Sequence, residues 1–469
     1  MKIKQMLKTV AIFFIGNALT KVIAFFMLPL YTNTSLIPQA HYGNYEFVFS
    51  LINLVVPIAF FQIWDGMYRI AFDYKENLDK QKVMSNAVAF SLIGVILYVA
   101  LFFILKFIFD IYCFELALVY GLIFGLNYLY TISTRVYLSN KLFVFSGLIS
   151  SVVTAGLNIL LLLQFNLGLT SIYISASAGL LIQIIIIELK IGVLRKFRIK
   201  HVSGQILRQM IRFSIPLCIA TVSYWLLSGF TKVLIDHFLG DAGNGVYGVA
   251  NKFSVFITFV VTVIQFAWNE TAYLISTEDK IERTKSYNVS LNIIVIGVIF
   301  CTGLFCLASK IIFPFMVHDD YIEALVIIPV SVVGVGANSL ASFLGTFFMA
   351  EKKNRCIWVS TLISAGVNVI GGYFFTKYFG LMGAIAVLSV SFLLLAIIRM
   401  VVASKAFKLK LKIKPLLLSV AILAVSVVAY YLIASKWIIL GVILAILLLV
   451  AILYRKKIKE ILKLLIKKS

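Results

Sequence analysis

Long runs of apolar residues, separated by short polar stretches, recur from one end of the chain to the other. Most of these runs have the length of about 20 residues that a helix needs to cross the hydrocarbon core of a bilayer. Of the 469 residues, 62% are hydrophobic and 13% are charged, whereas soluble domains carry about 25% charged residues. A soluble fold could not bury this much apolar surface, so the surrounding solvent must be lipid.

We therefore predict an all-α integral membrane protein with about 14 transmembrane helices. Turn-forming or helix-breaking residues mark most of the boundaries between the predicted segments. The segments are residues 9–30, 43–64, 85–109, 116–138, 143–165, 168–189, 211–235, 245–268, 289–313, 322–349, 356–376, 380–402, 415–434 and 437–454.

The chain has a net charge of +23, and its 42 lysines and arginines alternate between the two sides of the predicted bundle. Most lie at the two termini or in every second loop, whereas Lys106, Lys310, Lys377 and Lys436 lie at the opposite edges. By the positive-inside rule, this bias places both termini in the cytoplasm of a bacterial-type cell, with the helices in its cytoplasmic membrane. Anionic lipid headgroups then account for the positive charge, and we predict no nucleic-acid partner.

Several short motifs occur twice at a nearly constant offset. Because each copy of the repeat holds six segments, the two halves share one orientation and are related by a pseudo-twofold axis along the membrane normal. The matching pairs are Tyr42-Gly43 with Tyr247-Gly248, Gly156 and Asn158 with Gly366 and Asn368, and Gly168-Leu169 with Gly380-Leu381. The predicted units are a first lobe at 1–190, a linker at 191–210, a second lobe at 211–403, two added helices at 415–454, and a basic amphipathic tail at 455–469.

Together, these features resemble the multidrug/oligosaccharidyl-lipid/polysaccharide exporter superfamily, and within it the Wzx-type flippases of polysaccharide biosynthesis. Drug exporters of that superfamily usually have twelve spans, so a fourteen-span chain with lysines at cavity depth fits the lipid-linked branch better. The residues that carry the resemblance are the stretch from Phe14-Ile15-Gly16-Asn17 to Pro29-Leu30-Tyr31, Tyr42-Gly43, Trp64-Asp65-Gly66-Met67-Tyr68-Arg69, Tyr247-Gly248 and Gly380-Leu381-Met382-Gly383-Ala384.

The resemblance implies two six-helix lobes around a V-shaped central cavity, working by alternating access. It implies as substrate an undecaprenyl-pyrophosphate-linked oligosaccharide, such as an O-antigen or capsule repeat unit, that is flipped from the cytoplasmic to the outer leaflet. Polysaccharide polymerase machinery is then an expected partner, beside the lipid-linked substrate and membrane lipids.

A few charged residues fall inside the predicted segments, where a charge is costly and is by default a candidate functional residue. We expect Lys21 and Lys252 to bind the pyrophosphate, since lysine holds phosphate as a flexible point charge. Glu46 aligns with Lys252 across the repeat, so the axis should bring the two to equivalent places in the two lobes. The structural alternative is a Lys–Glu pair or lysines that extend to an interface, and for Lys232 we favour the latter.

Polar and aromatic side chains within the segments could line a path for sugars. Amides can hydrogen-bond hydroxyl groups and aromatic faces can stack on sugar rings, but polar residues also join helices to one another in membranes. For Asn158 and Asn368 the packing role is favoured. The candidates are Asn17, Glu46, Asn53, Gln62, Asn158, Tyr224, Trp225, Gln265, Asn338 and Asn368.

Two other classes of function remain open from the sequence. A cation-coupled drug exporter would require an acidic residue deep in a lobe, and a membrane-embedded glycan-assembly enzyme would require catalytic carboxylates or a sizeable outer loop. No phosphate-binding loop of the GxxxxGK[ST] type occurs, so we do not expect ATP hydrolysis. We predict no catalytic residue, metal or cofactor, with transport coupled to H⁺, Na⁺ or the membrane potential.

Overall fold

The computed structural model describes residues 20, 23, 25–74, 76–275, 280–351, 353 and 355–453, and every regular element in them is a helix. The all-α prediction is therefore confirmed for this part of the chain. Nine of the described helices are long and apolar enough to cross a membrane, or up to ten if a bent pair counts as one span. The protein is a multi-pass membrane protein.

The helices follow one another with short connections. Two of the helices are single 3₁₀ turns, η1 (Ile199–His201) and η2 (Asp319–Tyr321). The α-helices are α2 (Leu28–Tyr31), α3 (Gln39–Ala59), α4 (Ile63–Ala71), α5 (Asn77–Ile108), α6 (Phe114–Val136), α7 (Asn140–Leu163), α8 (Leu169–Ile191), α9 (Gly204–Ser228), α10 (Phe230–Ile275), α11 (Lys280–Met316), α12 (Glu323–Ala350), α13 (Arg355–Phe407), α14 (Ile413–Leu432) and α15 (Lys436–Leu453).

Two of these helices, α10 and α13, are too long to be single spans. Each contains one glycine with non-helical backbone angles, Gly240 (φ 70°, ψ −173°) and Gly380 (φ 59°, ψ −143°). Gly240 falls between the predicted segments 211–235 and 245–268, and Gly380 is the first residue of the predicted segment 380–402. Gly168, which the repeat pairs with Gly380, has nearly the same angles (φ 55°, ψ −134°), a conformation that glycine adopts at low cost. Most of the first predicted segment and the predicted tail at 455–469 lie outside the described residues.

The predicted segment 43–64 is not one straight helix. It divides into α3 and α4, whose axes differ by 52°. Phe61 and Gln62 between them both have left-handed backbone angles (φ 50° and 46°), which end the helical hydrogen-bond ladder. Pro57, in the last turn of α3, has no backbone N–H to add to that ladder. The prediction of a continuous helix over residues 43–64 was therefore wrong for its last residues, because α3 ends at Ala59 and α4 begins at Ile63.

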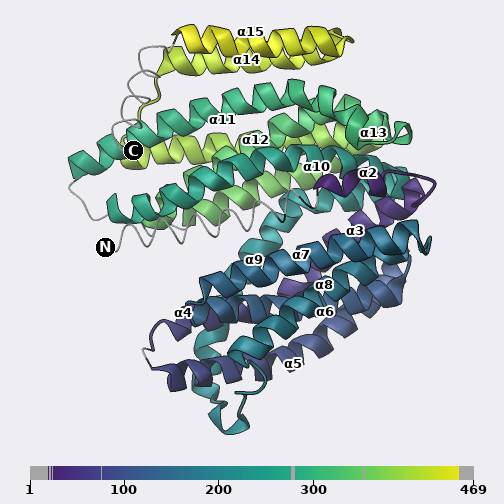
Figure 1. Ribbon diagram of the computed structural model, residues 1–469. Coiled ribbons are helices and arrows are strands. Elements are labelled where there is room, and N and C mark those ends of the chain that lie inside the picture. Colours follow the sequence, from purple (N-terminus) through teal and green to yellow (C-terminus); the bar gives the residue numbers. More distant parts are fainter. Residues whose placement is uncertain are drawn as a thin grey trace, which may run out of the picture.

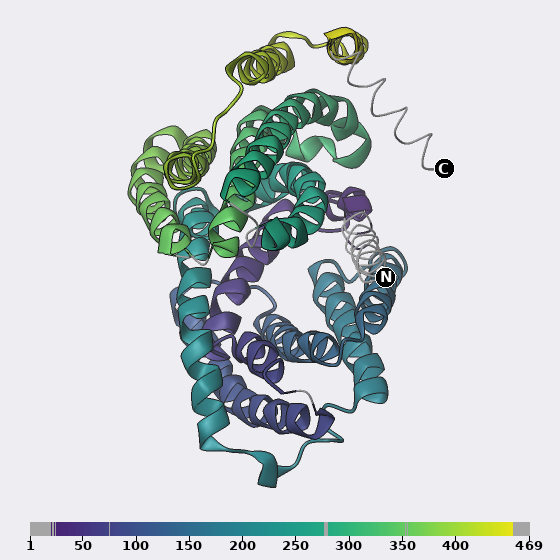
Figure 2. The ribbon, with the colours of Figure 1, turned by 90° about the vertical axis from the view of Figure 1, so that its left-hand side faces the viewer.

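The helices form two groups in space, as Figures 1 and 2 show. The first half of the chain contributes α3 to α8, and the second half contributes α10 to α13. The helix α9 joins them, because it packs on α4 of the first group and on α13 of the second. The added helices α14 and α15 pack on α11, at the outside of the second group.

The two groups meet where α3 begins, and we call this contact the closed end. It is formed by Thr34, Gln39, Gly43 and Asn44 of the first half with Asp241, Gly245 and Asp320 of the second. The Asn44 amide donates to both carboxylate oxygens of Asp241 at 3.2 Å, and the Thr34 hydroxyl donates to Asp320. A Cβ atom on Gly43 would overlap the backbone carbonyl of Asp241. Only glycine lets the two backbones approach this closely.

We predict that Gly43→Ala lowers the thermal midpoint of the purified protein, because the added methyl group must push α3 away from Asp241. Overpacking of this kind costs about 1–3 kcal/mol. Gly156→Ala is the matched control, since a Cβ there meets no heavy atom within 4 Å, and it should leave the midpoint unchanged or raise it. Equal midpoints for Gly43→Ala and the unsubstituted protein would contradict the close contact.

Candidate functional site

A buried carboxylate lies between two lysines where the two halves meet, and we call these three residues the lysine–glutamate cluster. Glu46 of α3 is 3% exposed. Its carboxylate oxygens lie 2.7 Å from Nζ of Lys232 and 2.9 Å from Nζ of Lys252, both on α10. Lys232 also donates to the backbone carbonyl of Glu46 at 2.8 Å. One carboxylate against two ammonium groups leaves the cluster with a net positive charge.

The repeated Tyr-Gly motif explains how the cluster can form. Gly43 brings α3 close to the second half, and Gly248 lies opposite Glu46, where a Cβ atom would be 2.8 Å from Glu46 Cγ. The hydroxyl of Tyr42 donates to Glu46 at 3.1 Å. Lys232 and Lys252 reach the same carboxylate because the break at Gly240 places one before and one after a change of helix direction.

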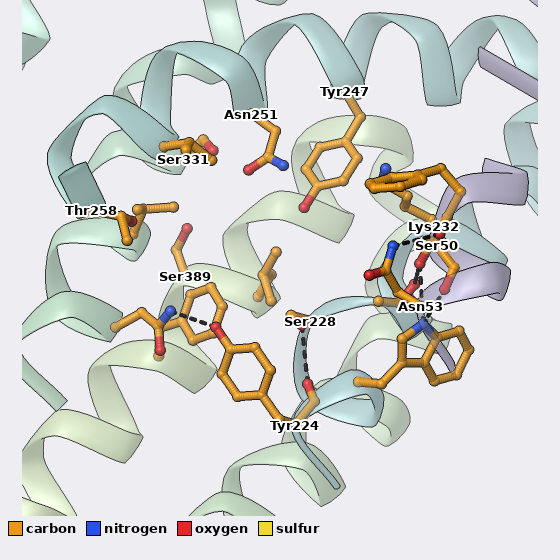
Figure 3. A pocket seen from close by; sticks show the side chains of 18 of the residues that line it. Ser50, Asn53, Tyr224, Ser228, Lys232, Tyr247, Asn251, Thr258, Ser331 and Ser389 are labelled. Atoms are coloured by element: carbon orange, nitrogen blue, oxygen red, sulfur yellow. Dashed lines mark hydrogen bonds between the residues drawn. The ribbon is translucent and has the colours of Figure 1, made fainter. Parts of the chain in front are cut away.

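The cluster separates two cavities. The first, of about 280 Å³, lies in the first half and is lined by Lys252 together with aromatic and small polar residues such as Tyr45, Tyr120 and Ser150. The second, of about 440 Å³, lies among α3, α9, α10, α12 and α13 and is lined by Lys232. Figure 3 shows its polar side chains. Neither lining includes an aspartate or glutamate among the described residues.

The structure brings together two of the predicted charged residues. Glu46 and Lys252, expected at equivalent places in the two lobes, are in direct contact, and Lys252 lines the first cavity. Lys21 and Asn17 lie outside the described residues.

The remaining predicted residues divide among several places. Tyr224 lines the second cavity, where its hydroxyl accepts a hydrogen bond from Asn338 at 2.8 Å. Gln62 is buried behind that lining and donates to Thr221 of α9 at 2.8 Å. Gln265 lies further along α10 and lines neither cavity.

The other sugar-path candidates also have defined positions. Asn53, Trp225 and Asn338 line the second cavity, and Asn158 lines the first. Asn158 donates to Tyr31 at 3.0 Å and Asn368 to Thr231 at 3.1 Å. In both halves, therefore, the repeated asparagine joins two helices, which agrees with the packing role favoured for it.

The sequence interpretation of Lys232 was wrong. Lys232 is 8% exposed and does not extend to an interface, because Glu46 offers both a carboxylate oxygen and a carbonyl oxygen within reach. Tyr247 and Asn251, which line the second cavity, were not singled out as site residues. The signal was present, since Tyr247 belongs to the repeated Tyr-Gly motif and Asn251 directly precedes Lys252.

The sequence matches no protein-family model and no curated protein, but the fold resembles those of solved structures. It is similar to the lipid II flippase MurJ in an inward closed conformation, with a TM-score of 0.66, 16% identity, and coverage of 95% of this chain and 99% of that one. It is also similar to an inward-facing multidrug resistance MATE family transporter, with a TM-score of 0.66, 13% identity, and coverage of 83% and 94%.

A third similar structure is a MOP superfamily transporter from Pyrococcus furiosus, described as having a binding pocket of reverse polarity. The TM-score is 0.62 at 12% identity, with coverage of 86% of this chain and 95% of that one. At such identities the likeness concerns the fold. The chain thus has the fold of the MOP-superfamily transporters and flippases.

Proposed function

We propose that this protein is a flippase that moves an undecaprenyl-pyrophosphate-linked oligosaccharide from the cytoplasmic to the outer leaflet by alternating access. The lysine–glutamate cluster is the observation that carries the proposal. It places a net positive charge between the two halves of the chain, beside cavities whose described linings hold no carboxylate. A lipid-linked pyrophosphate is an anion of the kind that such a site attracts. Lipid II flippase MurJ, whose fold is similar, is itself named for a lipid-linked substrate.

The pyrophosphate would compete with Glu46 for Lys252. The side chain of Lys252 is 38% exposed and that of Lys232 is 10% exposed, so Lys252 is the ammonium that a ligand in the first cavity can reach. Phosphate and carboxylate oxygens are both good acceptors for an ammonium group. Glu46 keeps its pairing with Lys232 when Lys252 turns to the substrate, so no carboxylate is left buried without a cation.

This exchange would weaken the contact between the two halves. The Lys252–Glu46 pair joins α10 to α3 close to the closed end. Losing it shifts the balance toward a state in which that end separates and the opposite end closes. Binding can drive such a change only if the ligand binds the second state better, and release of Lys252 from Glu46 provides that difference.

The charge bias of the loops supports a bacterial cytoplasmic membrane with both termini in the cytoplasm. The closed end then faces outward and the cavities receive substrate from the cytoplasm. Each negative charge that moves outward through 100 mV gains about 2.3 kcal/mol, so the membrane potential can drive export without a cofactor. We also predict that transport could be coupled to H⁺ or Na⁺ and that the protein works with polysaccharide polymerase machinery.

The alternatives have less support. A cation-coupled drug exporter needs a free acidic group in its cavity, whereas Glu46 is occupied by two lysines. A glycan-assembly enzyme needs a pair of catalytic carboxylates, and the described cavity linings have none. The similar structures reported above are transporters and a flippase.

We predict that Lys252→Gln weakens the binding of farnesyl pyrophosphate to the purified protein in lipid nanodiscs by about tenfold or more, the usual loss for a charge-assisted hydrogen bond. Flipping of a fluorescent lipid-linked pyrophosphate in proteoliposomes should fall in parallel. Lys436→Gln, which removes an ammonium that lies over Phe315 away from both cavities, should change neither measurement. Undiminished binding by Lys252→Gln would exclude this lysine from the anion site.

A second prediction concerns stability. Glu46→Gln should destabilise the protein by about 3–5 kcal/mol, because it leaves two lysines without their carboxylate. Adding Lys232→Met should restore most of that loss in a denaturation assay, since it removes the more buried ammonium. Adding Lys252→Met should restore less, since that side chain is already partly exposed. If both double variants were equally stable, the burial argument would fail.

A further inference from the structure

The second cavity contains polar groups that make no hydrogen bond to other residues in the described part of the chain. It is lined by α3, α9, α10, α12 and α13, and its volume of about 440 Å³ lies within the range of roughly 300–1,000 Å³ that is usual for small-molecule sites. In Figure 3, the side chains of Tyr247, Asn251 and Thr258 from α10 point into it. No hydrogen bond from these three side chains to another described residue is recorded, although Tyr247 is only 4% exposed.

Polar side chains that line a cavity without hydrogen-bonding other described residues are available to a ligand. Here they lie along one helix, α10, and face a shared space. Asn53 adds an acceptor from α3, because its amide nitrogen donates to Phe49 at 2.7 Å while its oxygen accepts no hydrogen bond from another described residue. A ligand with several hydroxyl groups, which both donate and accept, would satisfy such a mixed set.

Aromatic side chains complete the wall of the cavity and are held in place. The indole N–H of Trp225 donates to the backbone oxygen of Ser50 at 2.8 Å, and Asn338 fixes the hydroxyl of Tyr224. Their polar ends are thus already bonded, which leaves the apolar ring faces for contact with a ligand. Fixed walls lower the entropic cost of binding.

The charges of this cavity disfavour ionic ligands. Its described lining has no carboxylate to hold a cation. Lys232, its one lining cation among the described residues, already donates to the carboxylate and the backbone oxygen of Glu46. An anionic ligand would find that ammonium occupied, and a cationic one would find no counter-charge.

We propose that this cavity binds a neutral saccharide unit of the substrate, the one closest to the pyrophosphate. This inference rests on the proposed function and adds to it a second subsite and a substrate class. The cluster stands between the two cavities, so the pyrophosphate at Lys252 and the sugar beside Lys232 lie on its two sides. Hydroxyl groups of the sugar bond to Tyr247, Asn251 and Thr258, and the ring stacks on the aromatic wall.

The test compares three probes on the full-length protein in nanodiscs. They are farnesyl pyrophosphate, the same lipid carrying one neutral hexose, and the same lipid carrying one hexuronic acid. The neutral hexose should raise the affinity about tenfold, as one or two added hydrogen bonds would, and the hexuronic acid should raise it less. Tyr247→Phe and Asn251→Leu should each remove most of this gain and leave the binding of farnesyl pyrophosphate unchanged.

Tyr98→Phe is the matched control, because it also removes one tyrosine hydroxyl, here a buried one without a partner among the described residues, but lies on α5, away from this cavity. It should keep the full gain from the hexose. If the hexose adds no affinity, or if its gain survives in both cavity variants, the saccharide subsite is overturned while the proposed function stands. If farnesyl pyrophosphate itself does not bind, both proposals fail. Tighter binding of the hexuronic acid would overturn the neutral specificity.

Discussion

The shared carboxylate of Glu46 is the interaction on which the arrangement of the two halves depends. A single charge buried in this environment costs several kcal/mol, and here three charges are buried or half-buried together because each satisfies another. The carboxylate comes from the first half of the chain and both ammonium groups come from the second. The pairing therefore requires α3 and α10 to cross at one point, and it leaves a net positive charge between the two cavities.

The crossing is possible because small residues remove steric barriers around it. Gly43 and Gly245 let backbones touch at the closed end, and Gly248 makes room for Glu46 itself. Polar contacts between Asn44 and Asp241 then join the halves at the same end. These contacts and the lysine–glutamate cluster lie close together, so a ligand that competed for Lys252 would act directly on the contact between the two halves.

The two cavities differ in their chemistry. The first is lined by the partly exposed ammonium group of Lys252. The second is lined mainly by uncharged hydrogen-bond donors and acceptors and by aromatic rings. A substrate that carries an anionic group next to a neutral, hydroxyl-rich one would match both. Neither cavity alone would match both groups of such a substrate. The lysine–glutamate cluster connects the two cavities, because Lys252 lines the first and Lys232 lines the second.

Apolar runs, loop charges and repeated motifs in the sequence determined the helices, the membrane setting and the two-part plan, because these are local or periodic signals. Even the matching of Gly168 with Gly380 extends to their backbone angles. The sequence could not determine which polar residues meet. It placed Glu46 and Lys252 in equivalent positions, but only the crossing of α3 and α10 puts them in contact. The sequence interpretation placed Lys232 at an interface, because the acceptors of its ammonium group belong to Glu46, which lies 186 residues away in the chain. Burial and pairing depend on neighbours distant in the chain, so only the tertiary structure decided the site.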